Sequence, residues 1–456
     1  MSSIRITIDA SHTAGSGKNT GIERVVRNLC KNIRDVAAFR GIDESQVATH
    51  IRGHFFPIDE AQQRKFQYSA RWEADAQSFV PQWLQALPLV FADRWPKSKW
   101  RKWWRPSPSH LGAYKIPHLL YSRAVSMGRY VRGGAVSPST QDLLILPDAY
   151  WTRPEIWGTV SRYRQAGTFV ATLVYDLIPL THPQFVGQKR RQKFHLYLEE
   201  VIRNSDLIIA ISQTVRDDIA RYIREEMDGR ADSICRDIRS FTLGAEIKYE
   251  HGTVRPDIES LFSDDERSAP YLMVGSFDPR KNHHQAIDAF EQLWNSNPQI
   301  KLCLFGRTGS MCDDVIQRIA SHPMLNRGLF VFHDANDAEL LHAYQHASGV
   351  LLPSIVEGFG LPIVESLWHG KRTFVSDTPI HREVGGDQCD FFELGNPQSL
   401  AEAITAWEAE RERIGTIHPN KQRSLPTSWD ESTAQFLDLC LDAYATRQGI
   451  QRRLAA

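Results

Sequence analysis

Apolar and polar residues alternate at the start of the chain, over residues 4–9, and this pattern predicts a β-strand. A loop with glycines at positions 15, 17 and 21 follows, and residues 22–33 then place apolar side chains at helical spacing. Strand, loop and helix together form a βα unit. Its glycines lack the spacing G-x-G-x-x-G, so we do not predict a dinucleotide site here.

Continuous apolar runs, separated by helical stretches, occupy much of the remaining chain. They predict strands at 142–147, 168–176, 206–212, 271–275, 300–305, 329–332, 350–353 and 373–376, with helices such as 213–223, 285–294 and 338–347 between them. Such strands are typical of parallel sheets that helices cover on both faces. The fold class is therefore predicted to be α/β.

The order of these elements predicts two α/β domains. Residues 1–244 form the first domain and include an atypical insertion at about 83–135. Residues 245–269 are polar and predict a linker, residues 270–428 form the second domain, and residues 429–456 form a C-terminal helical segment. A length of 456 residues suits this organisation.

Composition and charge exclude several classes of protein. Lys and Arg number 54, as do Asp and Glu, so no global positive field points to nucleic acid. The six cysteines are scattered and lack zinc-site spacing, which predicts reduced thiols in a cytoplasmic protein. The N-terminus has no signal-peptide core, and no run approaches the ~20 apolar residues of a membrane span. Any membrane contact is therefore expected to be peripheral.

The most informative stretch is 354–365, Ser-Ile-Val-Glu-Gly-Phe-Gly-Leu-Pro-Ile-Val-Glu. The apolar run before it predicts a strand, and Pro362 suits the first turn of a helix because its missing N–H would be unpaired there anyway. A strand, a glycine loop and a helix present backbone N–H groups to an anion, usually a phosphate. Glu357 is predicted to lie in the loop and Glu365 in the helix, both facing one crevice.

Glu-x7-Glu around Gly-Phe-Gly-Leu-Pro resembles the signature of the retaining glycosyltransferases of family four. These enzymes have the GT-B fold, two Rossmann-like domains whose parallel sheets face an interdomain cleft, and their last helix commonly crosses back to the N-terminal domain. The resemblance implies that Glu357 lies close to the donor sugar and that Glu365 binds the ribose hydroxyls. The loop residues implied to line the donor site are Gly358, Phe359, Gly360 and Leu361.

Residues 275–282 follow the first strand of the second half and resemble the diphosphate-binding turn of the same family. Arg280 and Lys281 are expected to neutralise the departing nucleoside diphosphate. Many relatives have an Arg where this chain has Ser276, so the assignment of each cation to a phosphate stays open. Arg307 is a further candidate for donor binding.

Two other segments are implied to border the nucleotide sugar. Phe332 and His333 end a strand in the position that holds the nucleotide base, mainly through backbone groups, and the identity of the base stays open. Gly21, in a Gly-Ile-x-Arg run that resembles bacterial polysaccharide transferases, is expected to border the cleft.

Asp176 follows the strand at 168–176 and is the candidate for orienting or deprotonating the acceptor hydroxyl. Many relatives have His-Asp here, whereas this chain has Tyr175 before the Asp. The implied reaction retains the anomeric configuration, because the acceptor attacks beside the diphosphate, whose oxygen takes the proton. We expect neither a metal nor another cofactor: no Asp-x-Asp ends a strand, and Arg280 and Lys281 supply positive charge.

The insertion has an unusual run at 93–105, in which four Trp interleave with six basic residues. Trp favours the membrane interface and Lys and Arg are attracted to anionic headgroups. We predict a peripheral membrane or acceptor contact; a subunit interface and a locally packed loop are the alternatives. The residues concerned are Trp100, Lys102, Trp103, Trp104 and Arg105.

Taken with the resemblance, these features predict transfer of a hexose or deoxyhexose, with mannose or rhamnose favoured, from a nucleotide sugar. The expected acceptor is a growing, lipid-linked bacterial polysaccharide such as O-antigen, at the inner face of the plasma membrane. The alternatives are another GT-B enzyme, a nucleotide-sugar epimerase or a phosphorylase, or a catalytically silent nucleotide-sugar-binding subunit. The donor, the linkage and the oligomeric state stay open.

Overall fold

The protein is described here by a computed structural model. The structure describes residues 4–16, 20–58, 134–227, 235, 237–247, 252–262, 268–414 and 425–449. The Trp and basic residues predicted to contact a membrane or acceptor, Trp100, Lys102, Trp103, Trp104 and Arg105, lie outside the described residues.

The chain divides into two compact units, Met1–Val170 and Ala171–Ala456. The domain limits predicted from the sequence, at 244, 269 and 428, stay predictions.

The first unit is built on strands β1 to β4, with the order β3-β2-β1-β4. Strand β1 runs parallel to both β2 and β4, and β3 is antiparallel to β2. The elements are β1 (Arg5–Asp9), α1 (Ser11–Ser16), α2 (Gly21–Phe39), β2 (Glu44–Ile51), β3 (His54–Pro57), β4 (Asp142–Leu146), η3 (Tyr150–Thr152), η4 (Pro154–Ile156) and α7 (Trp157–Gln165). The predicted opening strand and helix are confirmed, whereas β2 and β3 were not predicted.

The second unit begins with three parallel strands in the order β5-β6-β7. Its first elements are β5 (Phe169–Val174), α8 (Ile178–Thr181), η5 (Pro183–Phe185), α9 (Gln188–Asn204), β6 (Leu207–Ala210), α10 (Gln213–Tyr222), η6 (Ile223–Met227) and β7 (Ile238–Ser240). The last helix of the chain, α18 (Trp429–Arg447), contacts this part. Ser432 Oγ donates to the Thr242 carbonyl at 2.7 Å, and Arg447 and Asp206 form an ion pair at 2.5 Å.

A six-stranded parallel sheet follows, in the order β10-β9-β8-β11-β12-β13. Its strands are β8 (Tyr271–Val274), β9 (Leu302–Phe305), β10 (Leu329–Phe332), β11 (Gly349–Leu352), β12 (Thr373–Ser376) and β13 (Asp390–Phe392). The intervening helices are α11 (Pro256–Leu261), η7 (Pro279–Lys281), α12 (His283–Ser296), α13 (Asp313–Ala320), α14 (Asp337–His346), α15 (Leu361–Trp368), α16 (Pro379–Gly385), η8 (Gly386–Gln388) and α17 (Pro397–Ile414). All the predicted strands of this half are confirmed.

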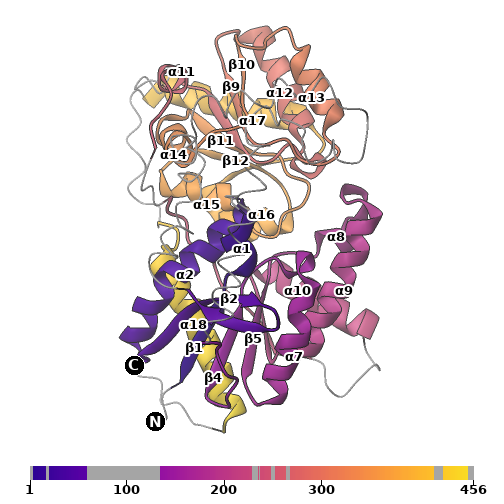
Figure 1. The fold of residues 1–456 in the computed structure, drawn as a ribbon. Coiled ribbons are helices and arrows are strands. Elements are labelled where there is room, and N and C mark those ends of the chain that lie inside the picture. Colours follow the sequence, from indigo (N-terminus) through magenta and orange to yellow (C-terminus); the bar gives the residue numbers. More distant parts are fainter. Residues whose placement is uncertain are drawn as a thin grey trace, which may run out of the picture. The chain divides into compact units, whose positions relative to one another are not determined.

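Helices cover both faces of the six-stranded sheet (Figure 1). Phe290 of α12, Ile319 of α13 and Leu400 of α17 pack in one apolar core with Leu304 of β9. Tyr344 of α14 and Ile363 of α15 belong to a second core on the other face. Strands buried on both faces explain the continuous apolar runs from which they were predicted.

The chain therefore has two Rossmann-like sheets. This confirms the predicted α/β fold class. Among the described helices, none combines the length and the apolar character that crossing a bilayer requires.

Candidate active site

Glu357 lies in the loop between β11 and α15, as the sequence predicts. Gly360, with φ of +97°, turns this loop into α15, and Pro362 occupies the first turn of the helix. Such a positive φ is readily adopted by glycine and strained for other residues. The Glu357 side chain is only 8% exposed, so its charge must be balanced by nearby groups.

Two cations balance the charge of Glu357. Arg280 Nη1 donates to Glu357 Oε2 at 2.7 Å, and Lys281 Nζ donates to the other carboxylate oxygen. Both cations come from η7, directly after β8. Burial acts to raise the pKa of Glu357, but the charges of Arg280 and Lys281 outweigh it and hold this pKa well below its usual range. Glu357 is therefore ionised at neutral pH.

The two cations respond to burial in different ways. Burial lowers the pKa of Lys281, and the charge of Glu357 acts against this. Burial also acts to lower the pKa of Arg280, yet the charges of Glu357 and Asp176 raise it above its ordinary value. Gly275 makes room for the lysine, since a Cβ at this position would lie 3.3 Å from Lys281 Cε.

Asp176 reaches the same cluster from the end of β5. Its pKa is raised by burial, while the charge of Arg280 acts to lower it. The Ile178 N–H donates to Asp176 Oδ1 at 3.0 Å and fixes the carboxylate. A Cβ at Gly358 would lie 2.2 Å from the Tyr175 carbonyl oxygen and 3.1 Å from Asp176 Cβ. The segment around Asp176 and the glycine loop are therefore in direct contact.

Further contacts hold this glycine loop in place. Ser212 Oγ donates to the Gly358 carbonyl at 2.8 Å, and Ile355 N–H donates to the Arg280 carbonyl at 2.8 Å. The Phe359 side chain is buried, and Leu361 begins α15. The structure thus brings together Asp176, Arg280, Lys281 and Glu357, all in the second unit.

Glu365 lies on α15, and its side chain is 1% exposed. The Tyr344 hydroxyl, from α14, donates to Glu365 Oε2 at 2.7 Å. The Tyr344 ring is stacked near His369 with a centroid distance of 6.0 Å. Tyr344, which orients the carboxylate implied to bind ribose, was not predicted from the sequence.

The ends of β8, β9 and β10 bring aromatic rings together. The Phe277 ring stacks on His283 at 4.5 Å between centroids and lies 5.1 Å from His333. His333 Nδ1 lies 3.1 Å from the Gly306 carbonyl oxygen. Burial lowers the pKa of His283 to about 3, so this ring is neutral. Phe277 and His283 were not predicted.

Other predicted site residues have the following positions. Ser276 Oγ donates to Asp278 Oδ2 at 2.6 Å, and Arg307 is exposed at the end of β9. Phe332 ends β10, with the Arg255 guanidinium 5.7 Å from its ring centroid. Gly21 begins α2 in the first unit. The roles of these residues stay predictions.

The first unit contains a buried polar network at the carboxyl ends of β1 and β4. Asp9 accepts hydrogen bonds from Ser11 Oγ at 2.5 Å and from the Tyr150 hydroxyl at 2.9 Å. Burial raises the pKa of Asp9 to about 6, although the Ser11 hydrogen bond acts to lower it. From the sequence, Asp9 was predicted only to end a strand.

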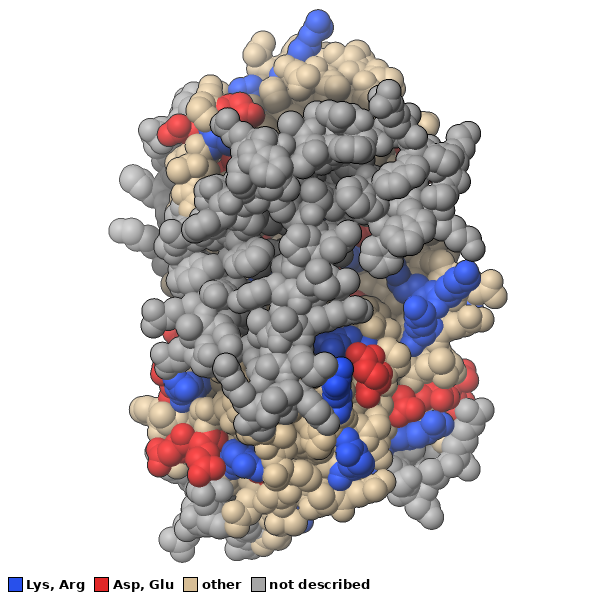
Figure 2. Space-filling model, in the orientation of Figure 1, with Lys and Arg blue, Asp and Glu red and all other residues tan. Residues whose placement is uncertain are grey.

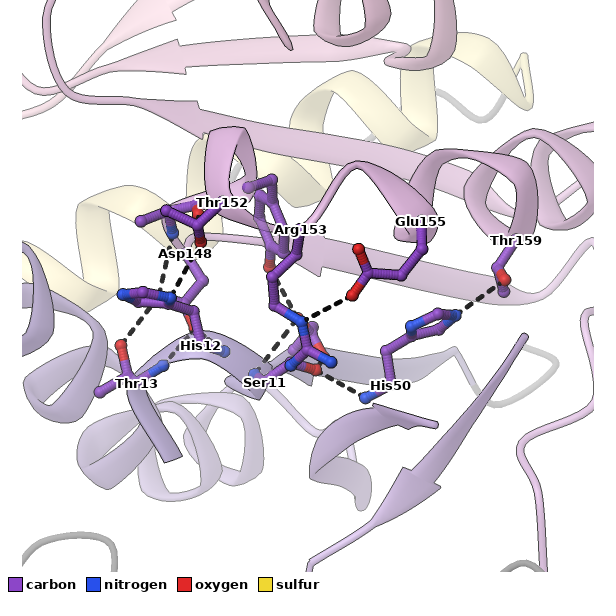
Figure 3. A network of polar contacts seen from close by, with 12 residues as sticks. Ser11, His12, Thr13, His50, Asp148, Thr152, Arg153, Glu155 and Thr159 are labelled. Carbon is purple, nitrogen blue, oxygen red and sulfur yellow. Dashed lines mark hydrogen bonds and ion pairs between the residues drawn. The ribbon is translucent and has the colours of Figure 1, made fainter. Parts of the chain in front are cut away.

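Asp148 is the second carboxylate of this network (Figure 3). It accepts from the backbone N–H groups of His12 and Thr13 at 2.8 Å each and from Thr13 Oγ1 at 2.8 Å. The His12 ring is held at Nδ1 by Thr152 Oγ1 at 3.0 Å. This network could have been predicted from the polar residues that directly follow neighbouring parallel strands. Ligands of α/β folds bind at the carboxyl ends of such strands.

Part of the candidate site lies in a region that is similar to known proteins. Residues 258–423 match the family model for glycosyl transferases group 1. The serotype-specific mannosyltransferase WbdA of Escherichia coli is 28% identical over 302 residues, which are 66% of this chain and 37% of the relative. The O-antigen chain mannosyltransferase RfbU of Salmonella typhimurium is 24% identical over 211 residues, 46% of this chain and 53% of the relative. This chain thus spans well under half of WbdA.

Solved structures share the fold. Anabaena HepE, solved in complex with UDP and glucose, has a TM-score of 0.52 at 15% identity, and the match covers 98% of this chain and 100% of HepE. Sucrose-phosphate synthase from Thermosynechococcus elongatus has a TM-score of 0.50 at 16% identity, covering 98% and 97%. The chain therefore has the GT-B fold, and its residues 258–423, which include Arg280, Lys281, Glu357 and Glu365, form a glycosyl transferases group 1 domain.

Proposed function

We propose that the protein is a retaining, metal-independent glycosyltransferase that moves a hexose from a nucleotide sugar to a hydroxyl of a growing bacterial polysaccharide. The observation on which this proposal chiefly rests is the cluster of Glu357, Arg280 and Lys281 beside Asp176. In this cluster a buried carboxylate holds two cations, and a second carboxylate adjoins the loop.

Each residue of the cluster has a role in the proposed reaction. The bond between the anomeric carbon and the diphosphate oxygen breaks, and negative charge grows on the diphosphate. Arg280 and Lys281 stabilise that charge, because fixed cations in a site shielded from water act strongly on developing charge. Both therefore supply the electrostatic stabilisation that a metal ion provides in other transferases.

The carboxylates act on the sugar and the acceptor. Glu357, ionised throughout, bonds sugar hydroxyls and stabilises the positive charge that develops on the ring. The acceptor hydroxyl attacks on the face that the diphosphate leaves, so the configuration is retained, and the diphosphate oxygen takes the proton. Asp176 orients this hydroxyl, and its raised pKa suits a group that shares the proton during transfer.

Mannose is the favoured donor sugar. WbdA and RfbU are both named as mannosyltransferases, and RfbU acts in O-antigen synthesis by its name. Their names favour mannose over rhamnose. We propose Glu365, held by Tyr344, as the partner of the ribose hydroxyls and the β8–β10 ends as the base site.

A lipid-linked acceptor, and action at the inner face of the plasma membrane, complete the proposal. A cationic cluster at the start of α9, formed by Lys189, Arg190, Arg191 and Lys193, supports this part. All four side chains are exposed, and among the described residues no carboxylate forms an ion pair with them. Figure 2 shows Lys and Arg side chains gathered over the region of α8 and α9. Each such cation contributes about 1 kcal/mol near an anionic bilayer.

The first experiment screens nucleoside diphosphates and nucleotide sugars for protection against thermal unfolding. A bound ligand raises the melting temperature by mass action, so one donor should stand out. Transfer from that donor to a polysaccharide acceptor, with NMR of the product's anomeric proton, then tests retention, and added EDTA tests metal independence. An inverted product refutes the retaining mechanism. Conversion of the donor without an acceptor would indicate an epimerase. A requirement for free phosphate would indicate a phosphorylase, and binding without turnover would indicate a catalytically silent subunit.

The membrane part has its own test. Flotation with vesicles containing phosphatidylglycerol should recover the protein, whereas vesicles of phosphatidylcholine alone should not. Replacing Lys189, Arg190, Arg191 and Lys193 by Gln should abolish flotation. The control removes the same number of exposed charges elsewhere, at Arg221, Arg224, Arg327 and Arg413. Equal loss in both variants would show that only net charge matters.

A further inference from the structure

His381, on α16, is fully buried beside the glycine loop of the candidate site. Its Nδ1 lies 2.9 Å from the Ser376 carbonyl oxygen. A carbonyl oxygen only accepts hydrogen bonds, so Nδ1 holds the proton and Nε2 presents a lone pair. Nε2 is buried without a hydrogen-bond partner among the described residues. The adjacent ring atom, Cδ2, would lie 3.8 Å from a Cβ at Gly360, so this ring edge faces the loop.

Hydrogen bonds connect this ring with the backbone of Ser354, three residues before Glu357. Ser376 ends β12, and its Oγ donates to the Ser354 carbonyl at 2.5 Å and lies 3.1 Å from His381 Nδ1. The buried Ser354 side chain acts to lower the pKa of Glu357, as a hydrogen-bonding neighbour of the carboxylate does. Strands β11 and β12 are neighbours in the sheet, with Leu352 opposite Val375, so both serines lie at the same ends of adjacent strands. The contacts therefore run from α16 across two strand ends to the loop that carries Glu357.

The ring has to be neutral to fit this position. Burial lowers the pKa of His381 and outweighs the hydrogen bond to the Ser376 carbonyl and the charge of Glu357, which both act to raise it. A protonated ring would place an Nε2–H without an acceptor in the core, which costs about 1–3 kcal/mol. It would also add a third cation to the surroundings of Glu357. A neutral imidazole provides the Nδ1 donor without that charge.

We propose that His381 is a positioning residue: its Nδ1–H, acting through Ser376 and Ser354, fixes the Glu357 carboxylate for sugar transfer. The inference rests on the proposed function, because it concerns the carboxylate assigned to the donor sugar. It assigns His381 no contact with substrate. The inference makes a specific prediction: only the hydrogen-bond donor at Nδ1 of His381 is needed to position Glu357.

Two substitutions distinguish the effect of the Nδ1–H donor from the effect of the volume of the ring. In His381→Asn the side-chain amide nitrogen takes the place of Nδ1, whereas His381→Gln places its amide at the position of Nε2. We expect His381→Asn to keep kcat within about threefold, and His381→Gln to lower it about tenfold to a hundredfold, the scale of a small misplacement of a reacting group. The KM for the nucleotide sugar and the affinity for the nucleoside diphosphate should stay within about twofold in both.

Ile380→Ala, in the same helix, is the control for a purely structural effect, because Ile380 is buried but outside the connection. It should lower the melting temperature and leave kcat unchanged. The inference is overturned if His381→Gln transfers sugar like the parent, or if Asn and Gln lose the same amount.

Crystal structures of the parent and of His381→Gln keep the inference testable if no donor supports transfer, an outcome that would refute the proposed function alone. In His381→Gln the bond between Arg280 Nη1 and Glu357 Oε2, 2.7 Å in the parent, should lengthen or exchange partners. An unchanged Glu357 carboxylate in that variant contradicts the inference.

Discussion

Glu357 and Asp9 are both buried carboxylates near the carboxyl ends of parallel strands, but their partners differ in kind. Glu357 faces two cations, and its pKa lies well below the ordinary range. Asp9 faces the hydroxyls of Ser11 and Tyr150, and its pKa is raised to about 6. Burial acts on both in the same direction, so the partners decide the protonation state. The second unit therefore holds a fixed charge, and the first holds a group that titrates just below neutral pH.

The largest effect should follow removal of the fixed charge. Glu357→Gln keeps the volume but leaves Arg280 and Lys281 without their carboxylate, and breaking such a pair costs about 3–5 kcal/mol. We expect kcat to fall about 10²–10³-fold while the nucleoside diphosphate still binds. Steady-state kinetics and calorimetry measure the two quantities. A variant that loses diphosphate binding and transfer equally would place Glu357 with the nucleotide rather than with the sugar.

Asp9→Asn, the corresponding substitution in the first unit, should change stability in the opposite direction to Glu357→Gln. The pKa of Asp9 rises from 3.8 to about 6 on folding, so the folded protein holds more protons than the unfolded chain between these values. Stability from this group is therefore full below pH ~4 and falls by about 3 kcal/mol as the pH rises through about 6. Asp9→Asn should remove that fall, so it gains stability relative to the parent as the pH rises.

Urea unfolding of Asp9→Asn and the parent between pH 4 and pH 8 measures this difference. Taking the difference cancels the contributions of titrating groups that do not interact with Asp9, whereas the charge of Asp148, which acts to raise the pKa of Asp9, is part of the measured effect. Parallel stability curves for the two proteins would contradict the assigned pKa.

Gly358→Ala tests the contact of the glycine loop with the segment around Asp176. The new Cβ would lie 2.2 Å from the Tyr175 carbonyl oxygen, so the loop must move. Overpacking of this kind costs about 1–3 kcal/mol, and we expect a lower melting temperature together with reduced transfer. Gly187→Ala is the control, since nothing lies within 4 Å of its Cβ position. Normal transfer by Gly358→Ala would show that Asp176 and Glu357 need not adjoin.

Tyr344→Phe should have the smallest effect on the rate of transfer. It removes the hydroxyl that donates to Glu365 at 2.7 Å and keeps the ring. Losing a hydrogen bond to a charged group costs about 1.5–3 kcal/mol, and we expect weaker nucleotide binding with kcat nearly unchanged. Tyr271→Phe is the control, because its hydroxyl bonds Glu408 instead. If calorimetry shows equal nucleotide affinity in both variants, Glu365 does not need Tyr344.

Local sequence predicted the features that depend on local chemistry. The loop from β11 to α15 was predictable because Gly360 and Pro362 have strong conformational preferences. Strands β8 to β12 were predictable because strands that are buried on both faces are continuously apolar. Strands β2 and β3 were missed: β2 is only partly buried, and more than half of its residues are polar. Strand β13 has three residues, too few for a periodic signal.

The missed site residues depend on contacts between distant parts of the chain. Tyr150 lies 141 residues from Asp9, and Tyr344 lies 21 residues from Glu365 on another helix. Nothing in the local pattern distinguishes these tyrosines from ordinary core residues. The pairing of Glu357 with Arg280 and Lys281 was also not predicted, although all three residues were named for the donor site.

That pairing has a consequence for the speed of the reaction cycle. In the structure, Glu357 is paired with the two cations that we propose for the diphosphate, so under this proposal an arriving donor exchanges one anionic partner for another. After transfer, the nucleoside diphosphate carries more charge than the donor did and would be held tightly by bare cations. Glu357 competes with the nucleoside diphosphate for the two cations. We expect this competition to shorten the residence time of the nucleoside diphosphate, which must dissociate before the next donor can bind.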